Sequence, residues 1–114
     1  MASETVAWLA DIDNAINEIN TFLPDKKNFI EFQKDLKTRR AIERNLEIIG
    51  EAVNRILQID SKITITNSRK IVDTRNRIIH GYDSVSEEIL WAIVIRDIPV
   101  LAAEVKDLLH NQMP

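Results

Sequence analysis

Cysteine is absent from this 114-residue chain, and glycine and proline are scarce, with two and three residues respectively. The lack of cysteine excludes a disulfide framework, a thiolate metal site and a cysteine nucleophile. A β-sandwich or barrel of this length needs many turns and therefore many glycines and prolines, whereas helices need few. We therefore expect an all-α fold in a single domain that covers residues 1–114.

Membrane spans, targeting signals and metal clusters are also missing from the sequence. No stretch approaches the roughly 20 uninterrupted apolar residues of a membrane span, and the first twenty residues carry four acids in place of an apolar run. The two histidines, His80 and His110, are far apart, and no ligand spacing typical of a metal site recurs. We expect a cytoplasmic protein without membrane contact, metal or cofactor.

An excess of positive charge is lacking too, because the formal net charge is −3, which argues weakly against a nucleic-acid binder. The distribution is uneven, however. Residues 26–44 hold seven basic and three acidic residues, and residues 69–80 hold four basic residues and one acid. Solvated helix faces are the simpler explanation for the first zone, whereas the second contains an unusual motif.

Apolar residues recur at the 3.6-residue spacing of amphipathic helices along most of the chain. This spacing predicts helices over residues 4–22, 26–60, about 67–80 and about 87–108, with a break in the long second segment near residues 35–37. Residues 61–66 alternate polar and β-branched side chains but have no partner strand, so we expect a loop. The predicted architecture is an antiparallel bundle of four main helices plus a short one.

Single residues refine this prediction. Ser3 is a plausible N-cap of the first helix, and Ser84 with Glu87 fits a capping box for the last. Pro99 lies inside the last helix and should kink it, because its ring crowds the carbonyl four residues earlier. Gly50 costs about 1 kcal/mol relative to alanine in a helix, so we expect it to permit the close approach of another helix.

The unusual motif is RNRIIHGY, residues 75–82. On a helical wheel Arg75 falls in the middle of the apolar arc, so its guanidinium needs either a partner or an escape to solvent. His80 falls on the polar face about 140° away, with Asn76 one turn before it. The two residues can converge only if the helix end unwinds or if a second protomer contributes.

The residue types nevertheless suit RNA cleavage by attack of a 2′-hydroxyl group. Histidine can take or give a proton near neutral pH. Arginine binds phosphate oxygens through a planar fork of donors and keeps its charge. Asn76 can orient either group. An unremarkable surface histidine, favoured by the dipole at a helix end, is the structural alternative for His80.

Three segments resemble the HepT toxins, a branch of the HEPN superfamily. Residues 75–82 match the pattern Arg-x-x-x-x-His-x-Tyr. The run IIGEAVNRI, residues 48–56, is similar to the central helix of the family, and EEILWAIVIRDIPVL, residues 87–101, is similar to its last helix. The resemblance covers about residues 5–110.

This resemblance implies a homodimeric helical bundle in which two signature helices meet at a cleft, and a metal-independent endoribonuclease. Arg75 and His80 would be catalytic, with Asn76 in support. It also implies a type VII-like toxin–antitoxin pair. An MntA-type nucleotidyltransferase, using ATP and magnesium, would transfer AMP to Tyr82 and silence the nuclease.

Two other interpretations remain open from the residues. The acidic net charge and the atypical segment before the motif fit a catalytically inactive subunit that docks onto a nucleotidyltransferase and helps to bind nucleotide or substrate. A helical bundle without any site is the third. Glu51 is a candidate partner for Arg75, although an ordinary i,i+4 pair with Arg55 is slightly favoured.

Overall fold

The structure is a computed structural model that describes residues 2–23, 28–80 and 85–111. In these ranges the chain is helical and contains no strand, so the predicted all-α class is confirmed. The elements are α1 (Ser3–Phe22), α2 (Phe29–Lys34), α3 (Leu36–Ile59), α4 (Ser68–His80), α5 (Glu87–Ala92), the π-helical turn η1 (Ile93–Asp97) and α6 (Ile98–His110).

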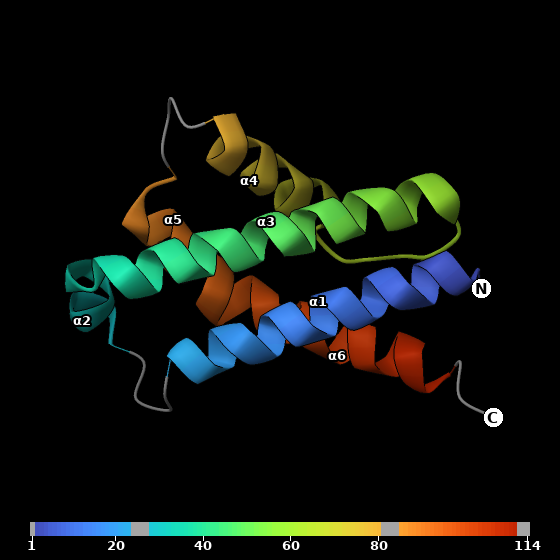
Figure 1. The fold of residues 1–114 in the computed structure, drawn as a ribbon, viewed down its shortest axis with the longest axis horizontal. Coiled ribbons are helices and arrows are strands. Elements are labelled where there is room, and N and C mark those ends of the chain that lie inside the picture. Colours follow the sequence, from blue (N-terminus) through green and yellow to red (C-terminus); the bar gives the residue numbers. More distant parts are fainter. Residues whose placement is uncertain (1, 24–27, 81–84, 112–114) are drawn as a thin grey trace.

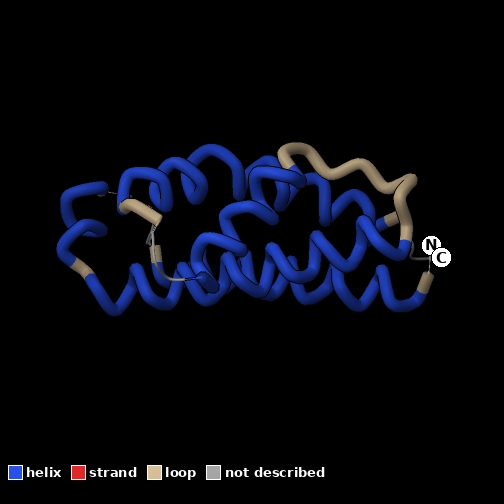
Figure 2. The backbone as a smooth tube through the Cα atoms, turned by 90° about the horizontal axis from the view of Figure 1, so that it is seen from above, coloured by secondary structure: helices blue, strands red, loops and turns tan. Residues whose placement is uncertain are grey.

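The helices form an antiparallel bundle, as predicted. The long helix α3 lies in the centre and packs against α1 on one side and α4 on the other, while α6 packs against α1 (Figure 1). Together α5, η1 and α6 form the fourth main helix, and α2 is the short extra one. Figure 2 shows the same bundle from above, with the start of α1 and the end of α6 at one end of the molecule.

The core lies between α1, α3 and the α5–η1–α6 segment, where the predicted apolar stripes face one another. Each fully buried aliphatic side chain contributes about 1.5–3 kcal/mol relative to an exposed one. The largest fully buried side chains are Leu9, Ile12, Ile16, Ile19, Ile42, Ile49, Val53, Ile56, Leu90, Val94, Leu101 and Val105.

The predicted break in the second helical segment occurs at Asp35, which ends α2 and caps α3. Its carboxylate accepts hydrogen bonds from the backbone N–H of Thr38 at 3.0 Å and from the hydroxyl of the same residue at 2.6 Å. These bonds favour the ionised form and hold the pKa of Asp35 below its ordinary value. A sequence-local capping interaction therefore separates the two helices.

Two predicted N-caps are wrong. α1 begins at Ser3 itself, preceded by Ala2 without a side-chain cap. α5 begins at Glu87 and is capped by Ser86, whose hydroxyl accepts from the N–H of Ile89; Ser84 lies outside the described residues. Two serines precede this helix start; the capping-box spacing favours Ser84, three residues before Glu87, but the helix is capped by Ser86.

Residues 61–66 form a loop, as predicted, and the loop is tied to the bundle. Ile65 is buried, and the hydroxyl of Thr66 donates to the carboxylate of Glu104 at 2.7 Å. Asn67, at a positive φ of 60°, directs its amide toward Asp97. The sequence also allows either residue to cap α4, but their side chains contact α6 and η1.

The irregularity expected around Pro99 takes the form of a π turn. The N–H of Ile98 bonds the carbonyl of Ile93, five residues back. Proline cannot donate to the carbonyl of Ile95 and its ring crowds that carbonyl, so a widened turn just before the proline accommodates it. The predicted kink is thus an insertion in the helical ladder, and it buries Asp97.

Candidate functional site

The candidate site lies where α3 and α4 make their closest approach, at Gly50 and Arg75. A Cβ atom added to Gly50 would lie 2.2 Å from the Cβ of Arg75 and 3.3 Å from the carbonyl oxygen of Ile71. Only glycine leaves room for this approach, so the predicted role of Gly50 is confirmed. The approach places Arg75 on the face of α4 that is turned toward α3.

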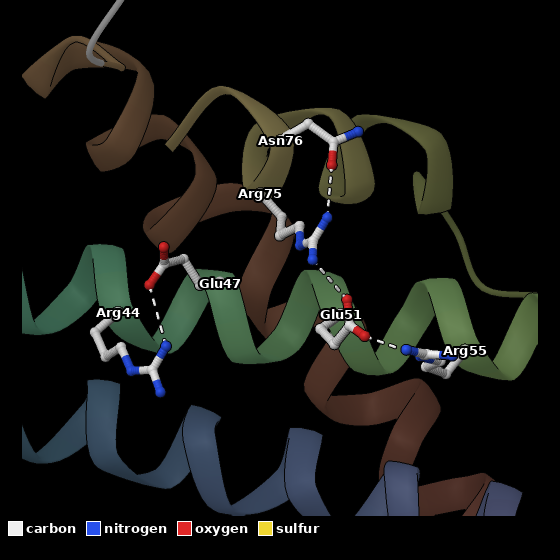
Figure 3. Close-up of polar contacts among 6 residues, drawn as sticks. All are labelled: Arg44, Glu47, Glu51, Arg55, Arg75 and Asn76. Carbon is white, nitrogen blue, oxygen red and sulfur yellow. Dashed lines mark hydrogen bonds and ion pairs between the residues drawn. The ribbon is translucent and has the colours of Figure 1, made fainter. Parts of the chain in front are cut away.

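The guanidinium of Arg75 is held by two side chains (Figure 3). Its Nη2 donates to Glu51 Oε2 at 2.8 Å, and its Nη1 donates to Asn76 Oδ1 at 2.9 Å. Its side chain is 27% exposed, and its Nε is buried without a partner among the described residues. The charge on the apolar arc is therefore paired and fixed in direction, with N–H groups still available to a ligand.

Glu51 contacts both of the partners that the sequence suggested for it, Arg55 and Arg75. Its Oε2 accepts from Arg75, and its Oε1 accepts from Arg55 at 2.9 Å, one turn along α3. The ordinary i,i+4 pair and the contact between helices exist together (Figure 3). Glu51 therefore links two cations, and its contact with Arg75 holds that side chain against α3.

A pocket of about 260 Å³ opens beside Arg75, lined by Trp8, Arg44, Glu47, Ile48, Glu51, Arg75 and Ile79. Arg44 Nη1 contacts Glu47 Oε2 at 3.3 Å (Figure 3). Neither Arg44 nor Glu47 was predicted from the sequence as a site residue. Their signal was present, since Arg44, Glu47 and Glu51 follow at three- and four-residue steps on one face of α3.

His80 is separate from this pocket. It is the last residue of α4, is exposed and does not line the pocket. Because α4 remains helical as far as His80, unwinding of the helix end does not bring this residue to Arg75. One chain gathers Arg75, Asn76 and Glu51 and leaves out His80. Tyr82 lies outside the described residues.

The described residues contain no group of three or more histidine, aspartate or glutamate side chains that could hold a metal ion. None of the described helices combines the length and the apolar character needed to cross a membrane. The pocket beside Arg75 offers the guanidinium groups of Arg44 and Arg75 and the carboxylates of Glu47 and Glu51. Guanidinium groups can bind the oxygens of an anion such as a phosphate.

Comparison with known proteins gives a consistent result over most of the chain. The sequence model of the family described as "Ribonuclease HepT-like" matches residues 12–108. A Methanocaldococcus jannaschii protein named "Putative RNase MJ0127" is 35% identical over 106 residues, which are 92% of this chain and 87% of that protein. A Thermococcus cleftensis protein named "Probable ribonuclease HepT" is 35% identical over 102 residues, 89% of this chain and 92% of that protein. No solved structure matches the chain.

Proposed function

Because the chain belongs to the HepT-like ribonuclease family, whose sequence model matches residues 12–108, we propose that it is a metal-independent endoribonuclease. The observation that carries this proposal is the fixed guanidinium of Arg75, paired with Glu51 and Asn76 beside an open pocket. Arg75 binds the scissile phosphate of RNA in this proposal, and His80 transfers protons.

RNA cleavage by a 2′-hydroxyl group requires a proton acceptor, a proton donor and stabilisation of negative charge, and it does not require a water molecule. The 2′-oxygen attacks the adjacent phosphorus, the bond from phosphorus to the 5′-oxygen of the next nucleotide breaks, and a 2′,3′-cyclic phosphate and a 5′-hydroxyl result. One group takes the proton of the 2′-hydroxyl and another gives a proton to the 5′-oxygen. Arg75 stabilises the negative charge that develops on the phosphate oxygens.

In the proposed homodimer, each protomer contributes one His80, so that two copies of this residue are present. The dimer also accounts for the distance between Arg75 and His80 within one chain. Five helical residues place His80 about 140° around α4 from Arg75 and about 7.5 Å along it. A two-fold axis beside α4 brings a second copy of each residue to a shared cleft. Ile79, which is 46% exposed and lines the pocket beside Arg75, is the apolar side chain we place in that interface.

Regulation by a cognate nucleotidyltransferase completes the proposal as a type VII-like toxin–antitoxin pair in the cytoplasm. Transfer of AMP from ATP to Tyr82, with magnesium in the partner enzyme, adds negative charge and bulk two residues after His80. The added phosphate competes with RNA for Arg75 and the adenosine blocks access. The toxin itself needs no cofactor in this scheme.

The test is RNA cleavage in excess EDTA by protein whose Tyr82 is shown by mass spectrometry to be unmodified. Wild type is compared with Arg75→Ala and His80→Ala, and Arg40→Ala, an exposed α3 residue paired with Glu43, is the matched control. We expect cleavage by wild type and control and a loss of at least about 100-fold in both site variants. Equal cleavage by all four proteins would show a contaminating nuclease and refute the assignment.

One observation favours a second candidate, the inactive binding subunit. The charge of Arg75 is already neutralised by Glu51 at 2.8 Å, which is also the state of an arginine with a structural role. Under this alternative, unmodified protein binds the nucleotidyltransferase and leaves RNA intact at every concentration. The same cleavage assay decides between the two.

A further inference from the structure

A second and larger cavity lies on the opposite side of α4 from Arg75. It is a groove of about 640 Å³ between α4 and the segment formed by α5 and η1, which are neighbours in Figure 1. Its floor is apolar, and its rims carry four cations and one exposed acid, Asp73. The cations are Arg69, Lys70, Arg77 and Arg96.

A buried carboxylate joins residues from the two rims of the groove. Asp97 in the π turn is 5% exposed and accepts from Lys70 Nζ at 2.7 Å. Arg96 Nε lies 3.4 Å away, and the amide of Asn67 lies 3.5 Å away. A buried charge requires such partners, so these contacts tie the start of α4 to the π turn and fix the distance between the two rims.

Three of the four cations remain available to a ligand. Lys70 is committed to Asp97, whereas Arg96 makes one long contact and its side chain is 69% exposed. Arg69 and Arg77 are exposed and form no ion pair with any described residue. The groove thus carries an excess of positive charge, with Asp73 as the one acid in its lining, in a chain whose net charge is negative. This excess would attract an anionic ligand.

The spacing of these cations suits a chain of phosphates better than a single one. Arg69 and Arg77 are eight residues apart on α4, a rise of about 12 Å along the helix, and Arg96 lies on the other rim. Arg77 is also within one turn of His80. A strand that leaves the groove past Arg77 would therefore pass near His80, the residue that we propose moves protons.

We infer that this groove binds the phosphodiester backbone of single-stranded RNA next to the cleavage site, with Arg69, Arg77 and Arg96 as the phosphate contacts. The inference rests on the proposed function for the identity of the strand. A single strand is chosen because in-line attack by a 2′-hydroxyl needs a backbone free to rotate out of helical geometry.

The chemistry of the groove also predicts how the RNA is recognised. Its described lining includes no aromatic side chain on which bases could stack, and its floor is formed by Ile89, Ala92 and Ile93. Binding there is therefore electrostatic, tolerant of base sequence and strongly dependent on salt. Neutralising each phosphate of a single strand adds about 0.7 to the slope of log affinity against log salt.

The test measures binding of a fluorescent oligouridylate to full-length protein in the His80→Ala background, at several salt concentrations. Arg77→Ala should lower the slope by about 0.7, and the Arg69→Ala/Arg77→Ala/Arg96→Ala triple variant by about 2. The same relation gives a loss of affinity of about 5-fold for one arginine and about 100-fold for three at 0.1 M salt. Arg40→Ala is the matched control and should leave both quantities unchanged.

The Asp73→Asn variant is a test in which misfolding cannot produce the expected result, because the expected result is a gain of affinity. Asp73 lines the groove and repels phosphate, so its neutralisation should tighten binding several-fold. Unchanged affinity and slope in both the triple variant and Asp73→Asn overturn the inference, as does a His80→Ala parent that binds no RNA. If the His80→Ala parent binds RNA as expected but the wild type never cleaves RNA, the proposed nuclease function is overturned and the groove remains an RNA-binding site.

A protein partner with an acidic surface is the other possible occupant. In that case the triple variant would bind oligouridylate as well as its parent does but would no longer bind the protein partner. This result would also count against the RNA assignment. If the nuclease is active and the inference holds, the triple variant raises KM and changes kcat little, because the three arginines lie away from the reacting atoms.

Discussion

Gly50→Ala is the substitution for which the structure makes its sharpest prediction. The added methyl group meets the Cβ of Arg75 at 2.2 Å and its Cγ at 2.8 Å. Carbon atoms without a bond between them prefer about 3.5–4.0 Å. The Cβ of Arg75 is fixed to the backbone of α4 and cannot swing aside, so α3 and α4 must separate by about 1.5 Å along that line.

Two opposing terms set the size of the effect. Alanine stabilises a helix by about 1 kcal/mol relative to glycine, whereas overpacking of a close contact costs about 1–3 kcal/mol. The separation also lengthens the 2.8 Å pair between Arg75 and Glu51. We expect a net loss of about 1–2 kcal/mol in the free energy of unfolding, which lowers Tm by about 4–8 °C in a domain of this length. The loss of RNA cleavage, expressed as a free energy, should exceed this loss of stability.

Urea denaturation and thermal melting followed by circular dichroism measure this change. Gln58→Ala, at an exposed position of the same helix, is the control and should stay within about 0.5 kcal/mol of wild type. In a double-mutant cycle, Arg75→Gly removes the opposing Cβ, so the two substitutions together should cost less than their sum. A Gly50→Ala protein about 1 kcal/mol more stable than wild type, with additive energies in the cycle, would refute the tight crossing.

Two further predictions concern carboxylates. Glu51→Gln should change the free energy of unfolding by less than about 1 kcal/mol, because both of its ion pairs are partly exposed; steady-state cleavage should show a lower kcat with no rise in KM, and an unchanged kcat would exclude a positioning role. The pKa of Asp35 is lowered in the folded protein, so its contribution to stability is present above its unfolded pKa of about 4 and is lost as the pH falls through the folded value. Asp35→Ala should therefore destabilise the protein in urea titrations at pH 7 and have less effect near pH 2, and a constant difference between the two pH values would contradict this.

Several local features of the fold were predicted correctly from the sequence alone. The apolar stripes, the break at Asp35 and the need for a special residue at Gly50 all depend on neighbours within one or two turns. The odd position of Arg75 on an apolar arc was visible for the same reason. Helical periodicity is a short-range property, and a short window of sequence contains it.

The N-caps and the π turn were predicted less well. Ser84 and Ser86 both satisfy the local rule for a cap, and the structure selects Ser86. Pro99 predicted an irregularity in the last helix, and the structure shows this irregularity as a π turn in which Asp97 is buried. Where two local solutions have similar energies, contacts with distant parts of the chain decide between them.

The sequence by itself determined the helical bundle and its approximate boundaries, and it contained the arginine–histidine motif on which the proposed ribonuclease function rests. Only the tertiary structure decided that Glu51 bridges Arg55 and Arg75, that Arg44 and Glu47 line the pocket beside them, and that a cationic groove lies on the far side of α4. The physical reason is distance along the chain. Glu51 and Arg75 are 24 residues apart, and their contact exists because two helices cross at Gly50.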